Sequence, residues 1–328
     1  MRIATSQFYI QSTKDMQDIQ ERLYTAQIQT SSGKRINAPS DDPVGAAKSL
    51  VLQSQEFAYG QYQRNINAAT SRLQQEEAAY QELEDLMVRV KVLAVQAANT
   101  GISNEQSRVG AAAEVREIEA EMLRLANLKD ANGEYIFAGL EVFQTPYQQP
   151  RAASGRATTD PKGLGRIRYQ GDELQRSMDI DPTRRLPYTD PGSDVFGEPF
   201  NQSIFGTMDG LIKSFETSNT PEGGLGVASS LELNRTINQL IATLDDQYQE
   251  VVAVHSSVGA RLQALDQEQR LNTTLQIQYV SIRSGIENVD FAEAATNLTL
   301  EATALQASQL AFVQVRGLSL FNYLAPGR

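Results

Sequence analysis

The stretch Gln29-Thr-Ser-Ser-Gly-Lys-Arg-Ile-Asn-Ala-Pro-Ser-Asp-Asp-Pro-Val-Gly45 separates two long helical patterns. Gly33 stands where a glycine commonly ends a helix, because it adopts the left-handed backbone without a steric cost. Asp41-Asp42-Pro43 is typical of a helix start, where a carboxylate accepts hydrogen bonds from unpaired N–H groups and proline loses no bond. We therefore expect Asp41 and Asp42 to cap a helix rather than to bind a metal.

Apolar residues recur every three or four positions on both sides of this stretch, which predicts helices with one apolar stripe each. The stripe before it consists of Tyr9, Ser12, Met16, Ile19, Leu23, Ala26 and Thr30. The stripe after it consists of Ile66, Ala69, Leu73, Glu76, Tyr80, Leu83, Met87, Val90, Ala94 and Ala97, of which only Glu76 is charged. A helix over residues 43–99 would be about 85 Å long, so we expect this part to be elongated.

The rest of the sequence consists of an irregular insert and a second helical region. Residues 141–200 hold seven of the eleven prolines and two β-like segments, at 166–170 and 174–180, and residues 134–138 also predict a strand. A capping box of Ser103 and Gln106 predicts a helix that stops at Asn132-Gly133. Further helices are predicted over 204–215 and over 233–265 or as far as Gly285, and a last one starts after Asp290. The last helix has a stripe of Ala295, Leu298, Ala302, Leu305, Gln309 and Phe312, and a second, overlapping stripe of Leu310, Val313, Gly317, Leu320 and Leu324.

These patterns predict a mainly α protein whose chain runs out and comes back. We expect residues 1–42 and 286–328 to pair as a coiled coil of terminal helices, because each has an apolar stripe that needs burial. Residues 43–140 and 201–285 would form a helical rod, and residues 141–200 a small β-rich outer domain. The second stripe of the last helix predicts further burial against other chains.

The composition excludes several classes of function. The chain has no Cys and one His, so disulfides, thiolate nucleophiles, Cys-ligated zinc and His-rich metal sites are excluded. A formal net charge of −11 argues against nucleic-acid binding and against docking on an anionic membrane. The sequence has no run of about 18 apolar residues, so it predicts no membrane-spanning helix. The first residues lack the features of a signal peptide. We therefore expect a structural or binding protein without cofactor or metal, in which His255 is a packing residue.

Four stretches resemble the flagellin-type family of bacterial flagellar proteins. They are residues 29–45, Ser256–Leu265, Ile286–Ala295, and the ending formed by Ala307–Phe312 and Leu318–Leu324. The ending and the Asp41-Asp42-Pro43 motif are more similar to the hook-associated members of the family than to filament flagellins. The resemblance covers roughly residues 1–140 and 201–328 and leaves the insert unmatched.

The resemblance implies a non-enzymatic adaptor between the hook and the filament of the flagellum, outside the cell. It implies a homo-oligomeric ring of about eleven copies, which contacts the preceding hook-associated junction protein on one side and filament flagellin on the other. It also implies unfolded export through the flagellar type III apparatus after a transient cytoplasmic stage, guided by a cytosolic chaperone. A chain without Cys suits such threading into an oxidising exterior.

Three groups of site residues follow from the stripes and the resemblance. Pairing of the terminal helices is expected to use Tyr9, Met16, Ile19, Leu23, Ala26, Leu298, Leu305 and Phe312. Contacts with the chaperone or a neighbouring subunit are expected at Leu310, Val313, Leu320, Phe321 and Leu324. Loop and subunit-interface candidates are Lys34, Arg35, Asp41, Asp42 and Arg261, with Arg261 in either an inter-helix or an inter-subunit contact.

Three alternative interpretations remain open at this point. A short filament flagellin would carry the same terminal motifs. The terminal stripes would also suit an intramolecular antiparallel coiled coil in a monomer. A carboxylate-based enzyme in the insert would draw on Asp160, Asp172, Asp179 and Asp181, whose spacing matches no metal-binding loop such as the EF-hand.

Overall fold

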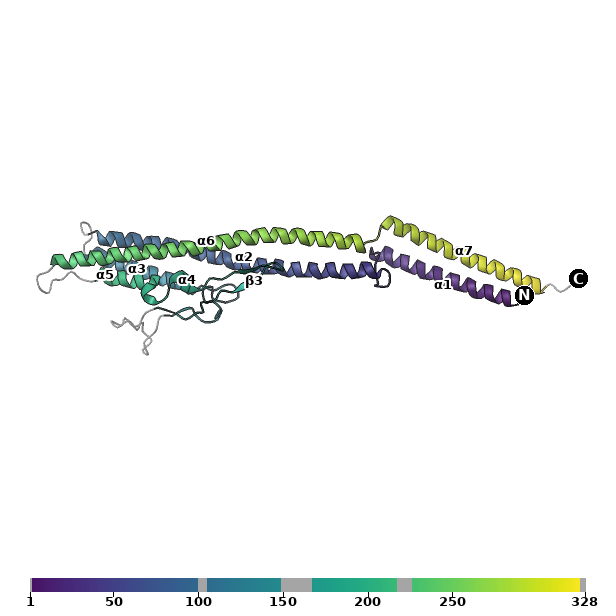
Figure 1. The fold of residues 1–328 in the computed structure, drawn as a ribbon, viewed down its shortest axis with the longest axis horizontal. Helices are drawn as coiled ribbons and strands as arrows, with labels where there is room; N and C mark the ends of the chain where they lie inside the picture. The colour runs from purple at the N-terminus through teal and green to yellow at the C-terminus, as the bar shows by residue number, and fades with distance from the viewer. Residues whose placement is uncertain (1, 100–104, 149–166, 217–225, 325–328) are drawn as a thin grey trace. The chain divides into compact units, whose positions relative to one another are not determined.

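The computed structural model describes residues 2–99, 105–148, 167–216 and 226–324, which are mainly helical, and this confirms the predicted fold class (Figure 1). The longer helices are α1 (Arg2–Ser32), α2 (Pro43–Ala98), α3 (Glu105–Ala126), α5 (Ile204–Glu216), α6 (Gly226–Glu287) and α7 (Phe291–Leu324). The short elements are β1 (Tyr147–Gln148), β2 (Arg168–Tyr169), β3 (Ser177–Asp179), β4 (Arg185–Pro187), α4 (Gly192–Phe196) and η1 (Phe200–Gln202). The chain divides into two compact units, Met1–Gly60 with Thr274–Arg328, and Gln61–Thr273.

Three helix boundaries lie where the capping residues predict them. Gly33 directly follows α1 and has a φ of +71°, the left-handed conformation that ends a helix. The N–H of Gly45 donates to Asp42 Oδ1 at 2.8 Å, which caps α2. The N–H of Ala292 donates to Asp290 Oδ1 at 2.8 Å and caps α7 in the same way.

The core of the second unit follows a seven-residue period on two helices. On α2 the side chains at this spacing are buried, namely Ile66, Leu73, Tyr80, Met87 and Ala94. On α6 the corresponding buried side chains are Ile237, Leu244, Val251, Val258 and Leu265. All ten belong to one hydrophobic cluster, to which α3 and α5 also contribute. A strict seven-residue repeat is typical of helices that pack side by side along their length.

Glu76 is the charged residue of the α2 stripe, and its side chain is completely buried. Its Oε1 atom lies 3.9 Å from Nε of Arg72. Burial raises the pKa of the Glu76 carboxyl well above its usual value, and the negative charge of Asp190 raises it further. A carboxyl with a raised folded-state pKa stabilises the fold at low pH, and this contribution is lost as the pH rises through that pKa.

Glu76→Gln is therefore expected to be more stable than the wild type at neutral and alkaline pH, because no charge has to be buried. Its advantage should shrink towards about pH 4, where the wild-type carboxyl is protonated in both states. Urea unfolding of both proteins over this pH range checks the prediction. A stability difference that does not change with pH would contradict it.

Helix α3 packs on α5 in the second unit (Figure 1). The predicted helix stop at Asn132-Gly133 is wrong, because α3 already ends at Ala126. The side chain of Asn127 binds the backbone of Tyr147 instead, donating to its carbonyl and accepting from its N–H, each at 3.0 Å. The predicted capping residue Ser103 lies outside the described residues.

Glu119 is a half-buried residue of α3 whose carboxyl is influenced by charges on α5. Burial raises the pKa of Glu119 to about 7, and the charge of Asp209 on α5 is the next cause. The wild type is expected to lose stability between about pH 4.5 and pH 7, as this group becomes ionised in the folded state. Glu119→Gln should flatten the pH dependence of the thermal midpoint over this window, whereas the same substitution at exposed Glu117 should leave it unchanged. Equal slopes for all three proteins would disprove the assignment.

The described part of the insert holds two small antiparallel ladders. Strand β1 pairs with β2 through Tyr147 and Tyr169, and β3 pairs with β4 through Met178 and Leu186. β2 and β3 lie inside the predicted segments 166–170 and 174–180. The strand predicted at 134–138 is wrong, because these residues form turns with one isolated bridge at Tyr135. The guanidinium of Arg72 donates hydrogen bonds to the carbonyls of Tyr135 and Ile136, at 2.8 and 3.2 Å. These carbonyls are therefore not available to a neighbouring strand.

Polar side chains of α2 and α6 hold this insert. Asn65 on α2 donates to the carbonyl of Asp179 at 2.7 Å, and Asn272 on α6 donates to the carbonyl of Ile180 at 3.0 Å. Arg261 on α6 pairs with Asp190 through both guanidinium nitrogens, at 3.0 and 2.9 Å. The insert is thus fixed to the two helices by directional bonds in addition to apolar packing.

Candidate assembly interface

Helices α1 and α7 lie side by side in the first unit (Figure 1). The rings of Tyr9 and Phe312 meet edge to face with 5.8 Å between centroids, and Arg22 pairs with Glu301 at 2.9 Å. The eight residues predicted to pair the helices are all buried or half-buried, namely Tyr9, Met16, Ile19, Leu23, Ala26, Leu298, Leu305 and Phe312. Among them only Ala26 is fully buried, so two helices alone leave the apolar seam partly open.

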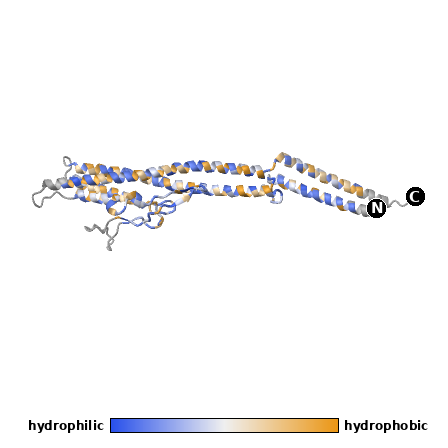
Figure 2. Ribbon diagram, in the orientation of Figure 1, coloured by the Kyte–Doolittle hydropathy of each residue, from blue (hydrophilic) through white to orange (hydrophobic). Residues whose placement is uncertain are grey.

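Large apolar side chains remain exposed throughout the first unit. Hydrophobic positions recur along α7 in Figure 2. The exposed residues are Ile10 and Tyr24 on α1, Val44, Leu50, Val51 and Phe57 on α2, Ile277 and Ile282 on α6, and Phe291, Leu300, Leu310, Val313 and Val315 on α7. So many exposed apolar side chains in one unit indicate a surface for other protein chains.

The residues predicted to contact a chaperone or a neighbouring subunit fall into two groups. Leu310 and Val313 are 69% and 66% exposed, so both are accessible to a partner. Leu320, Phe321 and Leu324 belong to the last turns of α7, but their side chains lie outside the described residues.

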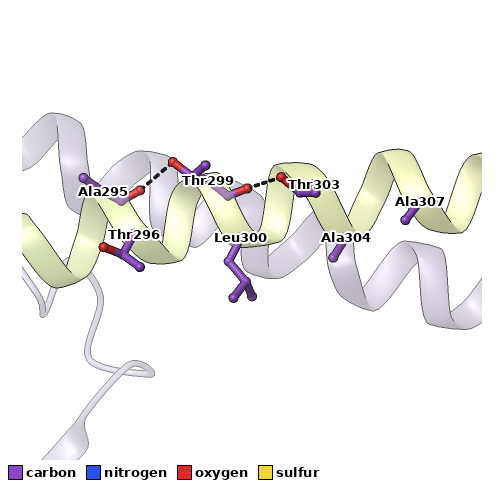
Figure 3. Close-up of a pocket in the computed structure, with 7 residues that line it drawn as sticks. All are labelled: Ala295, Thr296, Thr299, Leu300, Thr303, Ala304 and Ala307. Atoms are coloured by element: carbon purple, nitrogen blue, oxygen red, sulfur yellow. Dashed lines mark hydrogen bonds between the residues drawn. The ribbon is translucent and has the colours of Figure 1, made fainter.

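A shallow groove of small residues runs along the exposed face of α7 (Figure 3). Its lining consists of Ala295, Thr296, Thr299, Leu300, Thr303, Ala304 and Ala307. The hydroxyls of Thr299 and Thr303 donate to the carbonyls of Ala295 and Thr299, at 2.9 and 2.8 Å, within the helix. With its hydroxyl groups satisfied in this way, the groove has a mainly apolar surface. Sequence reasoning missed it, although Ala and Thr recur there every three or four residues.

The loop candidates all make contacts within the chain. The expected capping role is confirmed for Asp42 but is wrong for Asp41, which accepts hydrogen bonds from the loop N–H groups of Asn37 and Ala38, both at 2.9 Å, and so closes the loop. These backbone N–H groups hold the pKa of the Asp41 carboxyl below its usual value. Lys34 and Arg35 contact the end of α6, in the arrangement described below.

Arg261 and His255 lie on α6 in the second unit. The Arg261 side chain is 15% exposed and pairs with the nearly buried carboxylate of Asp190. His255 stacks on Tyr80 and lies 2.7 Å from Glu84, from Nδ1 to Oε1, which places it in the packing role expected of it. Of the insert carboxylates, Asp172 and Asp181 accept hydrogen bonds in local turns and Asp179 pairs with Arg185. Asp160 lies outside the described residues.

Two kinds of feature are absent from the described residues. Within residues 2–99, 105–148, 167–216 and 226–324, no group of three or more His, Asp or Glu side chains is placed to hold a metal ion. In the same part of the chain, no helix combines the length and the hydropathy needed to cross a bilayer.

Both ends of the chain match the flagellins. Residues 3–141 match the bacterial flagellin N-terminal helical region, and residues 241–324 match the bacterial flagellin C-terminal helical region. Flagellar hook-associated protein 3 of Escherichia coli is 27% identical over 326 residues, which cover 98% of this chain and 99% of the relative. Flagellin B of Helicobacter pylori is also 27% identical, but that match covers 70% of this chain and 43% of the relative. The crystal structure of the flagellar junction protein from Legionella pneumophila has the same fold, with a TM-score of 0.56 and 18% identity over 75% of this chain and 100% of that chain.

A mainly helical protein whose first and last helices pair, and whose two ends both match flagellin, is a structural protein of the flagellin type. The two matched regions together span more than half of the sequence. The chain therefore belongs to the flagellin family of bacterial flagellar proteins. Of the relatives compared above, the hook-associated protein matches it from end to end and the flagellin does not.

Proposed function

We propose that this chain is the structural subunit that joins the hook of a bacterial flagellum to its filament. The observation that carries the proposal is the end-to-end match with hook-associated protein 3, over 98% of this chain and 99% of the relative. The exposed apolar side chains of the first unit support it, because a subunit held between two assemblies needs surfaces for other chains. The protein acts outside the cell, as part of the flagellum.

Each of the three regions of the sequence forms a different structural part of this subunit. Residues 1–42 and 286–328 supply the inner coiled-coil layer, in which neighbouring copies cover the faces that the α1 and α7 pair leaves open. Residues 43–140 and 201–285 form the rod, and residues 141–200 form the outer domain. The exposed Leu310 and Val313 support this division, since each of them is more than half accessible in the single chain.

The proposed partners follow from the same surfaces. About eleven copies form a closed ring, in which each copy uses the same contacts. The ring contacts the preceding hook-associated junction protein on the hook side and filament flagellin on the distal side. Before export through the flagellar type III apparatus, a cytosolic chaperone covers Leu310, Val313, Leu320, Phe321 and Leu324. Co-purification that is lost when these five residues are removed would support the chaperone contact.

Deletion of the gene tests the proposed junction role. Cells that lack the gene are expected to carry hooks without filaments and to shed flagellin into the medium, because the filament has nothing to grow from. Complementation with the intact gene should restore filaments. Filaments of normal length on the deletion strain would overturn the proposal.

A short filament flagellin is the second candidate, favoured by the matches of both chain ends to flagellin regions. The two candidates differ in self-assembly, because a filament subunit adds to its own kind without limit and a junction subunit stops at a ring. Purified chain seeded with filament fragments distinguishes them. Growth of long filaments from this chain alone would favour the flagellin.

A further inference from the structure

Two breaks in the helices of the first unit meet at one place. Residues 33–42 connect α1 to α2, and residues 288–290 connect α6 to α7. The N–H of Val289 donates to the carbonyl of Gly33 at 3.0 Å, and the N–H of Arg35 donates to the carbonyl of Glu287 at 2.6 Å. Between these bonds Lys34 and Asn288 face each other as an isolated antiparallel bridge. The two turns are therefore joined by backbone hydrogen bonds across more than 250 residues of sequence.

Arg35 adds a second connection between the two breaks. Its guanidinium donates to the carbonyl of Ile286 at 2.9 Å, in the last turn of α6, where carbonyls lack a partner within the helix. The same guanidinium donates to Asp42 Oδ2 at 3.2 Å, and Asp42 caps the first turn of α2. One side chain thus bridges the end of one helix and the start of another.

At the end of α6, the side-chain contacts centre on Glu287. Its carboxylate accepts a hydrogen bond from Ser49 on α2 and pairs with Lys34 at 3.1 Å and with Arg283 at 3.4 Å. The Glu287 side chain is 15% exposed, so these partners lie in a partly desolvated site where charge-assisted bonds are strong. Arg283 continues the network to Glu56 on α2, at 3.1 Å.

We propose that Gly33–Arg35 and Ile286–Val289 form a clasp, which makes the α1–α2 turn and the α6–α7 turn open and close together. Opening either turn alone would leave N–H and carbonyl groups of the other turn without partners, which is unfavourable. Helices α1 and α7 would therefore change position relative to the adjoining parts of α2 and α6 as a pair, and neither could do so singly. A force or partner that acts on α7 is in this way transmitted to α1.

Hydrogen exchange of the full-length chain tests this coupling, because exchange of an amide reports the opening of its hydrogen bond. The readouts are the peptides that cover residues 33–42 and 286–292. Glu287→Ala substitutes a residue of the α6 side, and we expect about tenfold faster exchange in both peptides, as the loss of a charge-assisted bond implies. The free chain is used throughout, so the result does not depend on the junction role.

The reciprocal variant, Arg35→Ala, substitutes a residue of the α1–α2 turn and should again speed exchange in both peptides. Its side chain is about half exposed, so this variant keeps the fold and carries the test if Glu287→Ala unfolds. Glu293→Ala is the matched control, because Glu293 is exposed near the start of α7 and should leave both peptides unchanged. The proposal is overturned if only the peptide that contains the substitution responds. It is also overturned if the amides of Arg35 and Val289 exchange at unprotected rates in the wild type.

Discussion

A strain whose only copy of this chain carries Phe312→Asp is expected to be non-motile, with hooks but without filaments. The Phe312 ring packs edge to face on Tyr9 in the seam between α1 and α7, at 5.8 Å between centroids. An ionised carboxylate in this partly buried apolar seam is strongly unfavourable, because it loses part of its hydration there. Helices α1 and α7 should then separate. The surface that the pair offers to neighbouring subunits should be lost at the same time.

The second unit should survive this substitution, because its hydrophobic cluster lies within residues 61–273. Swimming radius and flagellin in the medium measure the effect, and circular dichroism of the purified chain verifies that the helices of the second unit remain. Phe143→Asp is the matched control, because the Phe143 side chain is 80% exposed in the insert. Normal swimming with Phe312→Asp would remove the terminal pair from the proposed function.

Arg261→Ala is expected to destabilise the second unit by about 3–5 kcal/mol, the range typical of breaking a buried ion pair. The Asp190 side chain is only 2% exposed, and both of its oxygens accept from the Arg261 guanidinium. Removal of the cation leaves a carboxylate that is neither hydrated nor neutralised. Gln175, which donates to Asp190 Oδ1 at 3.0 Å, cannot replace the lost charge.

Urea unfolding of the purified chain measures this loss. Arg270→Ala is the control, because Arg270 is exposed and its pair with Asp266 should contribute less than about 1 kcal/mol. The double variant Arg261→Ala/Asp190→Ala removes the uncompensated charge and should recover part of the stability. If Arg261→Ala and Arg270→Ala had equal effects, the pair with Asp190 would not hold the insert.

The sequence predicted the helices best where the determining chemistry is local. Gly33, Asp42 and Asp290 mark helix boundaries through bonds to residues a few positions away. The strand at 134–138 was predicted wrongly because its carbonyls bind Arg72, more than sixty residues away. The partners of the short strands, such as Tyr147 for Tyr169, also depend on how the chain folds back, which a two-residue segment cannot specify.

For the candidate interface as well, local features were predictable from the sequence and long-range contacts were not. The heptads indicated eight positions of α1 and α7 that are buried or half-buried in the structure, because a stripe on a helix is a local property. They did not identify the groove on α7, since a pattern of Ala and Thr does not say which face another element covers. They also gave no sign that Arg35 reaches the carbonyl of Ile286 or that Arg261 meets Asp190. Residues that are distant in sequence form these contacts, and no periodicity records them.

The seven-residue period of α2 and α6 has a consequence for how the length of this pair can change. Each added residue turns the following side chains by about 100° around the helix axis, so one extra residue in α6 would move Val251 and Val258 out of the core. Seven residues added to both helices return every apolar side chain to nearly its original direction. Insertions and deletions in this segment are thus tolerated only in steps of one heptad, about 10 Å along the axis. The packing that holds the helices together thereby also fixes the lengths that the pair can adopt.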